Sequence, residues 1–139
     1  MKVTDLLTAI AALDNHTLSL CKQGDIVVSD GSGISPMMDY IAQGRDLSGY
    51  SVADIIVGRA AAMLFIKAGI KEVYAQVLSL GGKEVLDKFN IPYSYGSLTD
   101  YIINRSGSGV CPMETAVADI EDAEEAYVCL RAKLDSMRG

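Results

Sequence analysis

Hydrophobic and polar positions along this chain alternate between two periods, which predict helices and strands in turn. Apolar residues spaced three and four positions apart predict a first helix from Thr4, its cap, to about Leu13. The period then changes to two on both sides of residues 22–25, which predicts a β-hairpin with a tight turn. Ser35 and Pro36 open a short second helix.

The middle of the chain predicts a buried helix packed against a sheet. A short strand at residues 52–53 is followed by Asp54, which is placed to cap a helix over about residues 55–67. This helix is apolar nearly all round and rich in alanine, so it is expected to be buried on more than one side. Gly69 ends it.

The second half of the chain continues the alternation. It predicts a strand over residues 72–78, a turn at Gly81 and Gly82, a helix over 83–89, a strand over 91–95, and an amphipathic C-terminal helix from Asp122. The order predicts one α/β domain spanning residues 1–139. We expect three layers, with a mixed sheet that starts with a β-hairpin and with helices on both faces.

Composition narrows the classes of partner. The 139 residues are 50% hydrophobic, enough for a single core, and the formal net charge of -6 disfavours binding to nucleic acid. No run approaches the ~18 apolar residues of a membrane span, and no signal peptide is recognised, so a cytoplasmic protein without a membrane partner is expected. Three widely spaced cysteines favour reduced thiols.

The residues that usually hold zinc are sparse. His16 is the only histidine, and the chain contains neither a CxxC pair nor an HxE motif. No zinc site can be assembled from local sequence, and no metal or cofactor is expected.

A glycine-punctuated loop before a predicted helix start carries most of the candidate chemistry. Amide and guanidinium donors precede two glycines, and a cysteine stands before the proline that opens the helix; the residues are Asn104, Arg105, Gly107, Gly109, Cys111, Pro112 and Glu114. Such a loop is typical of a pocket wall for a small polar or anionic ligand.

Cys111 near a helix start is also a candidate nucleophile, because the helix dipole favours its thiolate. Glu114 or Asp54 would then move protons. The alternatives are a buried cysteine with no base beside it, a Glu114 that completes the helix start, and an Asp54 that caps a helix.

Two further segments suit an anion. Gly58 and Arg59 at a helix start combine free N–H groups with a guanidinium fork, although Gly58 could instead allow close packing while Arg59 reaches for water. Gly31 and Gly33 flank a serine in a turn that could cradle a phosphate or form an ordinary corner.

The element order is similar to the cytidine-deaminase-like fold. Blocks at residues 30–36, 53–62, 73–75, 103–105 and 111–114 resemble a family of small prokaryotic proteins with a domain of unknown function, placed in the deaminase-like superfamily. The resemblance covers nearly the whole chain. It implies a deaminase-like scaffold without its zinc ligands, because residues 57–61 and 78–82 lack the deaminase signatures.

Three hypotheses of function follow. We favour a metal-free binding protein for a nucleotide-like or ADP-ribose-like molecule, which retains the cleft without turnover. The first alternative is a metal-independent enzyme acting on a nucleotide or sugar derivative, with Cys111 as nucleophile. The second is an interaction protein that forms homo-oligomers through the hairpin edge or through the helix carrying Met37 and Met38.

Overall fold

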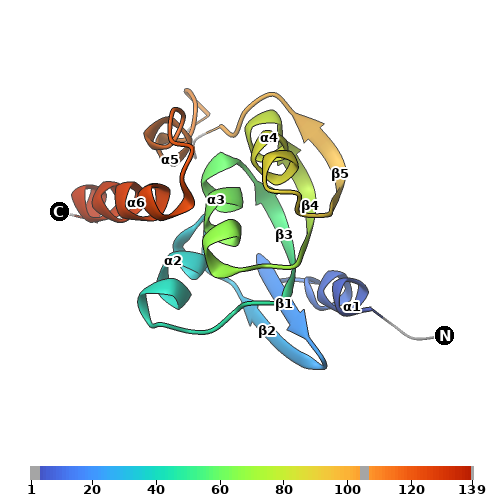
Figure 1. The fold of residues 1–139 in the computed structure, drawn as a ribbon. Coiled ribbons are helices and arrows are strands. Elements are labelled where there is room, and N and C mark those ends of the chain that lie inside the picture. The colour runs from blue at the N-terminus through green and yellow to red at the C-terminus, as the bar shows by residue number, and fades with distance from the viewer. Residues whose placement is uncertain (1–3, 104–106, 139) are drawn as a thin grey trace.

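The computed structural model describes residues 4–103 and 107–138. Its centre is a five-stranded mixed sheet in the order β2-β1-β3-β4-β5 (Figure 1). β1 pairs antiparallel with both β2 and β3, whereas β3, β4 and β5 run parallel. The strands are β1 (Leu18–Lys22), β2 (Asp25–Ser29), β3 (Ser51–Val57), β4 (Glu72–Ser79) and β5 (Tyr93–Thr99). The predicted α/β class, with a mixed sheet that begins with a hairpin, is confirmed.

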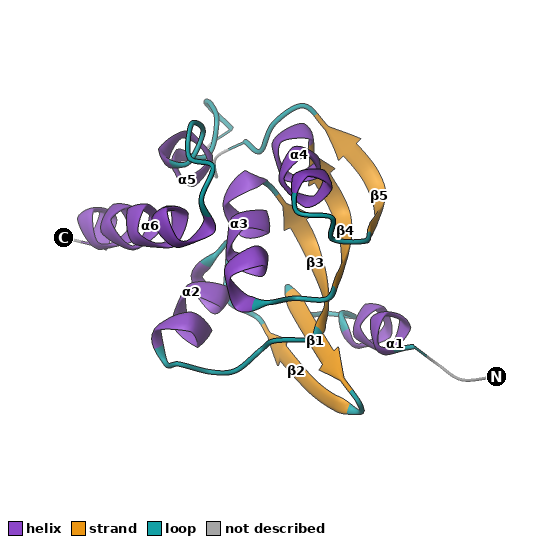
Figure 2. Cartoon of the chain, viewed as in Figure 1, coloured by secondary structure: helices purple, strands orange, loops and turns teal. Residues whose placement is uncertain are grey.

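Six helices in the described residues accompany the sheet (Figure 2). They are α1 (Asp5–Ala12), α2 (Ser35–Ala42), α3 (Arg59–Ala68), α4 (Leu80–Lys88), α5 (Pro112–Ala116) and α6 (Ala123–Arg138). The side chain of Thr4 caps α1, as predicted, and the carboxylate of Asp122 accepts a hydrogen bond from the backbone N–H of Glu125 at 2.9 Å at the start of α6.

The hairpin follows from its turn residues. Gln23 and Gly24 both adopt positive φ, at 49° and 86°, the combination that matches the twist of a two-residue hairpin turn. The register then sets Leu20 against Val27 and turns both toward the main core. The hairpin prediction is confirmed at this level of detail.

The predicted helix over residues 55–67 is wrong at its start. Ser51–Val57 form a seven-residue central strand, and the helix begins only at Arg59. Asp54 therefore lies inside β3 and caps nothing. The reason is that Ile55, Ile56 and Val57 are β-branched and fit a pleated strand between two neighbours, while Gly58 breaks the run.

The predicted limits of the next two elements shift as well. Ser79 caps α4 by accepting the backbone N–H of Gly82 at 3.0 Å, so Gly81 and Gly82 belong to the first turn of the helix. A Cβ on Gly82 would lie 3.0 Å from the carbonyl oxygen of Val57, and the glycine thus allows α4 to approach the end of β3. β5 begins later than predicted and continues to Thr99.

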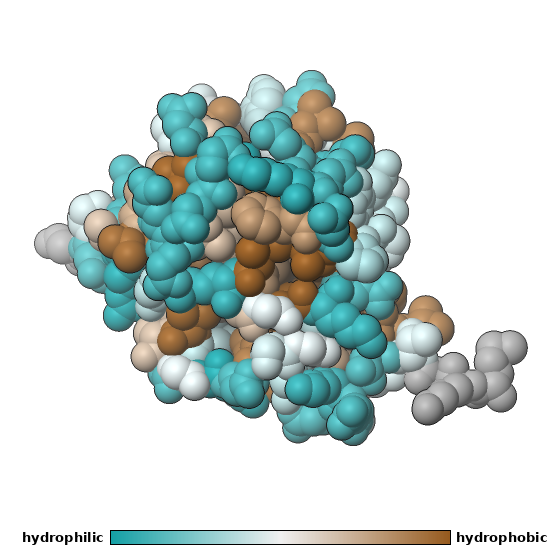
Figure 3. Space-filling view, viewed as in Figure 1, coloured by the Kyte–Doolittle hydropathy of each residue, from teal (hydrophilic) through white to brown (hydrophobic). Residues whose placement is uncertain are grey.

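Two cores lie on opposite faces of the sheet. A small cluster joins α1 to β1 and β3 through Ala9, Leu13, Cys21 and Ala53. The larger core lies on the other face, beneath α2, α3, α4 and α6, and its largest fully buried side chain is Phe65 of α3. On that face, polar residues surround an apolar area near the middle of the view (Figure 3).

The surface features expected for self-association are only partly present. Met37 and Met38 are buried in the main core, so they do not offer the exposed methionine face that the sequence suggested. The edge strand β2 does expose Ile26 and Val28. None of the helices that the structure describes is long and apolar enough to cross a membrane.

Candidate functional site

A cavity of about 320 Å³ opens where β3 ends and α3 begins. Ligands of α/β proteins commonly bind at this edge of the sheet, outside the carboxyl ends of the parallel strands. Its walls come from five separate parts of the chain: Thr17; Ser32, Gly33 and Ile34; Asp54, Ile55 and Ile56; Gly58, Ala60 and Ala61; and Ile102, Ile103, Cys111, Met113 and Glu114.

Five residues predicted from the sequence meet in this cavity. They are Gly33, Asp54, Gly58, Cys111 and Glu114, and they come from the β2–α2 loop, β3, the start of α3 and the α5 segment. The candidate nucleophile and both candidate proton carriers therefore share one cavity, although they were proposed from unrelated sequence patterns.

Other predicted residues lie elsewhere. Gly31 does not line the cavity. A Cβ on Gly31 would come within 2.9 Å of Pro36 Cγ. Gly107 and Gly109 are exposed and do not line the cavity. Asn104 and Arg105 fall outside the described residues.

Glu114 occupies the anion position at the start of α3. Its two carboxylate oxygens accept the backbone N–H groups of Arg59 and Ala60 at 2.7 and 2.8 Å. Gly58, the residue before the helix, has no side chain to cap it. The anion that Gly58 and Arg59 were predicted to hold is thus supplied by the chain itself, 55 residues further on.

Close packing explains why residue 58 is a glycine. A Cβ on Gly58 would overlap the carboxylate of Glu114 and would lie 2.8 Å from Cγ1 of Ile102. Any larger residue must therefore displace the cap of α3.

Burial raises the pKa of Glu114 above its ordinary value. The N–H groups of Ala60 and Arg59 and the positive charge of Arg59 act in the opposite direction. Because both oxygens are engaged, Glu114 serves here as a remote helix cap and is poorly placed to carry protons.

The guanidinium of Arg59 turns away from the cavity. Arg59 is only 7% exposed, and its Nε donates to the carbonyl oxygen of Val117 at 2.8 Å, while Nη2 donates to that of Ile120. Glu121 and Glu84 lie 3.4 and 3.6 Å from its terminal nitrogens. Arg59 therefore ties the start of α3 to the connection between α5 and α6.

Asp54 is the most unusual group in the cavity. It is 9% exposed, and burial raises its pKa to about 7. The backbone N–H of Ile56 lies 3.4 Å from Oδ1 of Asp54, and the N–H of Ile55 also bonds to the carboxyl group. In the described part of the chain, no lysine, arginine or histidine forms an ion pair with it. A buried acid of this kind marks a candidate functional site.

Asp54, Cys111 and Glu114 share the cavity but do not form a metal centre. Across residues 4–103 and 107–138, no three histidine, cysteine, aspartate or glutamate side chains are close enough to hold a metal ion. Cys111 is half-buried at the start of the five-residue helix α5 and is not part of a disulfide.

Several wall residues were missed at the sequence level. Thr17, Ile34, Ile102 and Met113 carry no motif, because apolar residues and a threonine next to strands are ordinary core positions. Ser32 lies between the two predicted glycines, so its position could have been inferred from them.

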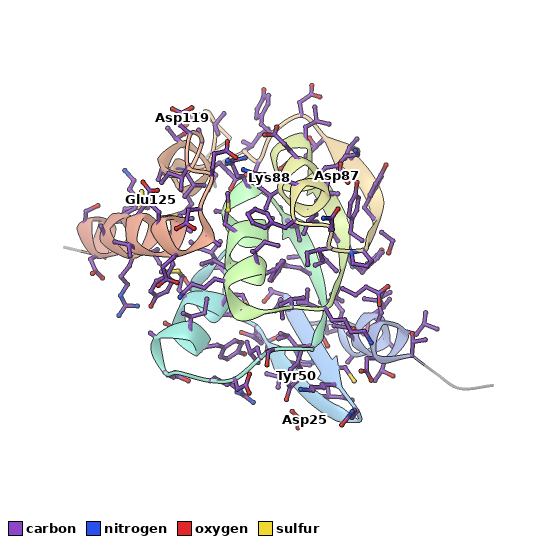
Figure 4. All side chains as sticks on the ribbon, in the orientation of Figure 1. Asp25, Tyr50, Asp87, Lys88, Asp119 and Glu125 are labelled. Atoms are coloured by element: carbon purple, nitrogen blue, oxygen red, sulfur yellow. The ribbon has the colours of Figure 1, made fainter. Side chains whose placement is uncertain are left out.

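A second hollow, over α4, has a different character. Leu80, Lys83, Glu84, Asp87 and Lys88 line it. Lys83 and Asp87 form an ion pair at 2.9 Å, and Lys88 pairs with Glu121. Asp87 and Lys88 both lie at α4 (Figure 4). Charges that already pair with one another on an open surface form a solvated groove, so we assign no site there.

Comparison with known proteins places the chain in a family. The family model TM1506, described as a domain of unknown function (DUF1893), matches residues 7–134. A crystal structure of a DUF1893 family protein from Thermotoga maritima superposes with a TM-score of 0.85 at 24% identity, covering 96% of this chain and 92% of that one. At this identity the likeness concerns the fold alone. No curated protein matches the chain.

The pKa of Asp54 predicts a distinctive pH dependence of stability. Burial moves this pKa from 3.8 to about 7, so ionising Asp54 in the folded protein costs of order 4 kcal/mol. The folded protein keeps a proton that the unfolded chain releases between about pH 4 and 7. The contribution of Asp54 to the free energy of unfolding therefore falls as pH rises through this window.

Asp54→Asn is expected to remove this contribution. Relative to wild type, the variant should gain stability between pH 4 and 7 and keep that gain above pH 7, as measured by urea denaturation across pH 4.5–8. Asp39→Asn, at an exposed position of α2, is the control, and its stability relative to wild type should not show this rise with pH. A difference between Asp54→Asn and wild type that is equal at pH 5 and pH 8 would contradict the assignment.

The contact across Gly58 predicts a coupling with Glu114. Gly58→Ala should lower the free energy of unfolding by about 2 kcal/mol, because the new methyl group displaces the carboxylate that caps α3. Gly109→Ala, where a Cβ meets nothing within 4 Å, is the control. In a double-mutant cycle, Glu114→Ala should cost less in the Gly58→Ala background than in wild type; strict additivity would show that the two residues do not interact.

Proposed function

The chain belongs to the DUF1893 family, and from its cavity we propose that it is a metal-free binding protein for a nucleotide-like or ADP-ribose-like small molecule. The observation that carries the proposal is Asp54, a buried carboxyl group that faces the cavity without a basic partner among the described residues. An isolated buried acid lowers stability, and such groups are concentrated at functional sites.

The cavity suits the base of such a ligand better than its phosphates. Its volume is near the lower end of the ~300–1,000 Å³ that small-molecule sites occupy. Aliphatic side chains of Ile56, Ile102 and Ile103 offer apolar walls for a flat ring, and Asp54 offers a polar group for its edge. Phosphates would lie toward the mouth, where Ile103 is half-exposed.

The scaffold supports the same proposal. A mixed sheet that starts with a β-hairpin, with helices on both faces, agrees with the deaminase-like fold expected from the sequence resemblance. Across residues 4–103 and 107–138, no group of three histidine, cysteine, aspartate or glutamate side chains could hold a metal ion.

A panel of nucleosides, nucleotides and ADP-ribose tests the proposal. At 100 times its dissociation constant, a ligand should stabilise the protein by ~2.7 kcal/mol, measured as a shift in thermal unfolding. Ala61→Leu, which puts a larger side chain into the cavity wall on α3, should abolish this shift. Ala132→Leu, at an exposed position of α6, should retain it. The proposal fails if no compound stabilises wild type, or if Ala61→Leu binds as well as wild type.

A second candidate function is a metal-independent enzyme acting on a nucleotide or sugar derivative. It is favoured by the presence of the Cys111 thiol in the same cavity as Asp54, which would supply the nucleophile and the proton carrier. Iodoacetamide at neutral pH should then label Cys111 faster than Cys129, whose Sγ donates to the carbonyl oxygen of Ala116 at 3.3 Å. Lack of reaction at Cys111 would rule out a thiolate mechanism.

A further inference from the structure

The interior of the cavity carries acids without bases. Asp54 and Glu114 are its two carboxyl groups and Cys111 its thiol, and no lysine, arginine or histidine lines it among the described residues. The N–H groups that begin α3 are already used by Glu114, and the guanidinium of Arg59 points to Val117 and Ile120. An anion entering the cavity would therefore meet acidic groups and, among the described residues, no cation free to bind it.

Asp54 has room for hydrogen-bond donors. The backbone N–H of Ile56 donates a long bond of 3.4 Å to Oδ1 and the N–H of Ile55 also bonds to the carboxyl group, but no side chain donates to it in the part of the chain that the structure describes. A carboxyl group presents two oxygens in one plane, so its natural complement is a planar group with two parallel N–H bonds. An amidine-type arrangement, in which one carbon carries two nitrogens, has this geometry.

Resting on the binding function proposed above, we propose that the buried part of the ligand is a planar amidine-type nitrogen group, able to carry positive charge, that binds Asp54, and that the cavity excludes anionic groups. The arrangement occurs both in amino-substituted heterocycles and in simple amidines and guanidines. Asp54 thus determines which end of the ligand enters.

The walls fit a flat group of this kind. The cavity is lined with apolar surface from Ile34, Ile56, Ile102, Ile103 and Met113. Burial of a flat ring against such surface is favourable, and the low-dielectric surroundings strengthen a charged hydrogen bond made inside.

Binding should depend on pH through Asp54. A cation favours the ionised carboxylate, so affinity should rise as pH increases through about 7, where Asp54 loses its proton. The other titratable groups facing the cavity are Glu114 from α5 and Cys111 before it. Glu114 is held by the N–H groups of α3. Substitution of Glu114 would therefore disturb the cavity wall as well as the charge of the cavity.

Three compounds of nearly equal shape separate charge from size: benzamidine is a cation, benzamide is neutral and benzoate is an anion. Affinity for wild type at pH 8, measured by calorimetry or by the shift of amide resonances around Asp54, should follow the order benzamidine, benzamide, benzoate. A charge-assisted bond predicts that benzamidine binds roughly 10-fold or more tighter than benzamide. The preference should shrink at pH 5.5.

Asp54→Asn tests the residue. The substitution keeps the shape of the side chain, so it should remove the preference for benzamidine while leaving benzamide bound. Ala61→Leu should weaken all three compounds, and Ala132→Leu should weaken none. Retention of the benzamidine preference in Asp54→Asn, or benzoate binding as tightly as benzamidine to wild type, overturns the inference.

The inference and the proposed function fail differently. If nucleosides bind and Ala61→Leu blocks them, but none of the three probes binds, the binding function stands and the amidine inference is overturned. If neither the nucleotide panel nor the three probes stabilise or bind the protein, both are overturned. If the affinities for the three probes follow their charge in wild type and no longer do so in Asp54→Asn, both are supported.

Discussion

The carboxylate of Glu114 holds the first turn of α3, and the arrangement of the cavity depends on this contact. α3 is the helix at the centre of the main core, yet the residue that precedes it, Gly58, has no side chain with which to cap it. Glu114 satisfies two of the N–H groups that an α-helix leaves unpaired at its start. In doing so it fixes α5 beside the start of α3, and Cys111 and Met113 lie in the cavity wall.

The same contact determines the charge of the cavity. A helix N-terminus is ordinarily ready to receive an external anion, but here the acid comes from within the chain. Arg59, the one cation at this helix start, stabilises the connection between α5 and α6 by bonding to Val117 and Ile120. Among the described residues, Asp54 consequently has no cation beside it, and burial raises its pKa to about 7 although the backbone N–H groups of Ile56 and Ile55 act in the opposite direction.

Local signals predicted much of the fold from the sequence. The hairpin depends on Gln23 and Gly24, the cap of α1 on Thr4 and the start of α6 on Asp122, and each acts within a few residues. The boundary between β3 and α3 was missed because an unbroken apolar segment satisfies either a buried strand or a buried helix. Only the β-branched residues before Gly58 distinguish the two, and Asp54 was misread as a cap in consequence.

The candidate site could be predicted only as a set of residues and not as a geometry. Cys111, Glu114, Gly58 and Asp54 were each singled out by local chemistry, but the pairing of Glu114 with α3 spans 55 positions and has no local signature. Once that pairing is known, the roles separate on physical grounds. An acid whose two oxygens both cap a helix start is a structural support, whereas a buried acid that no basic side chain pairs with is available for a ligand. The sequence shows two similar carboxylates, and their surroundings alone make Glu114 a support of the cavity and Asp54 its candidate recognition group.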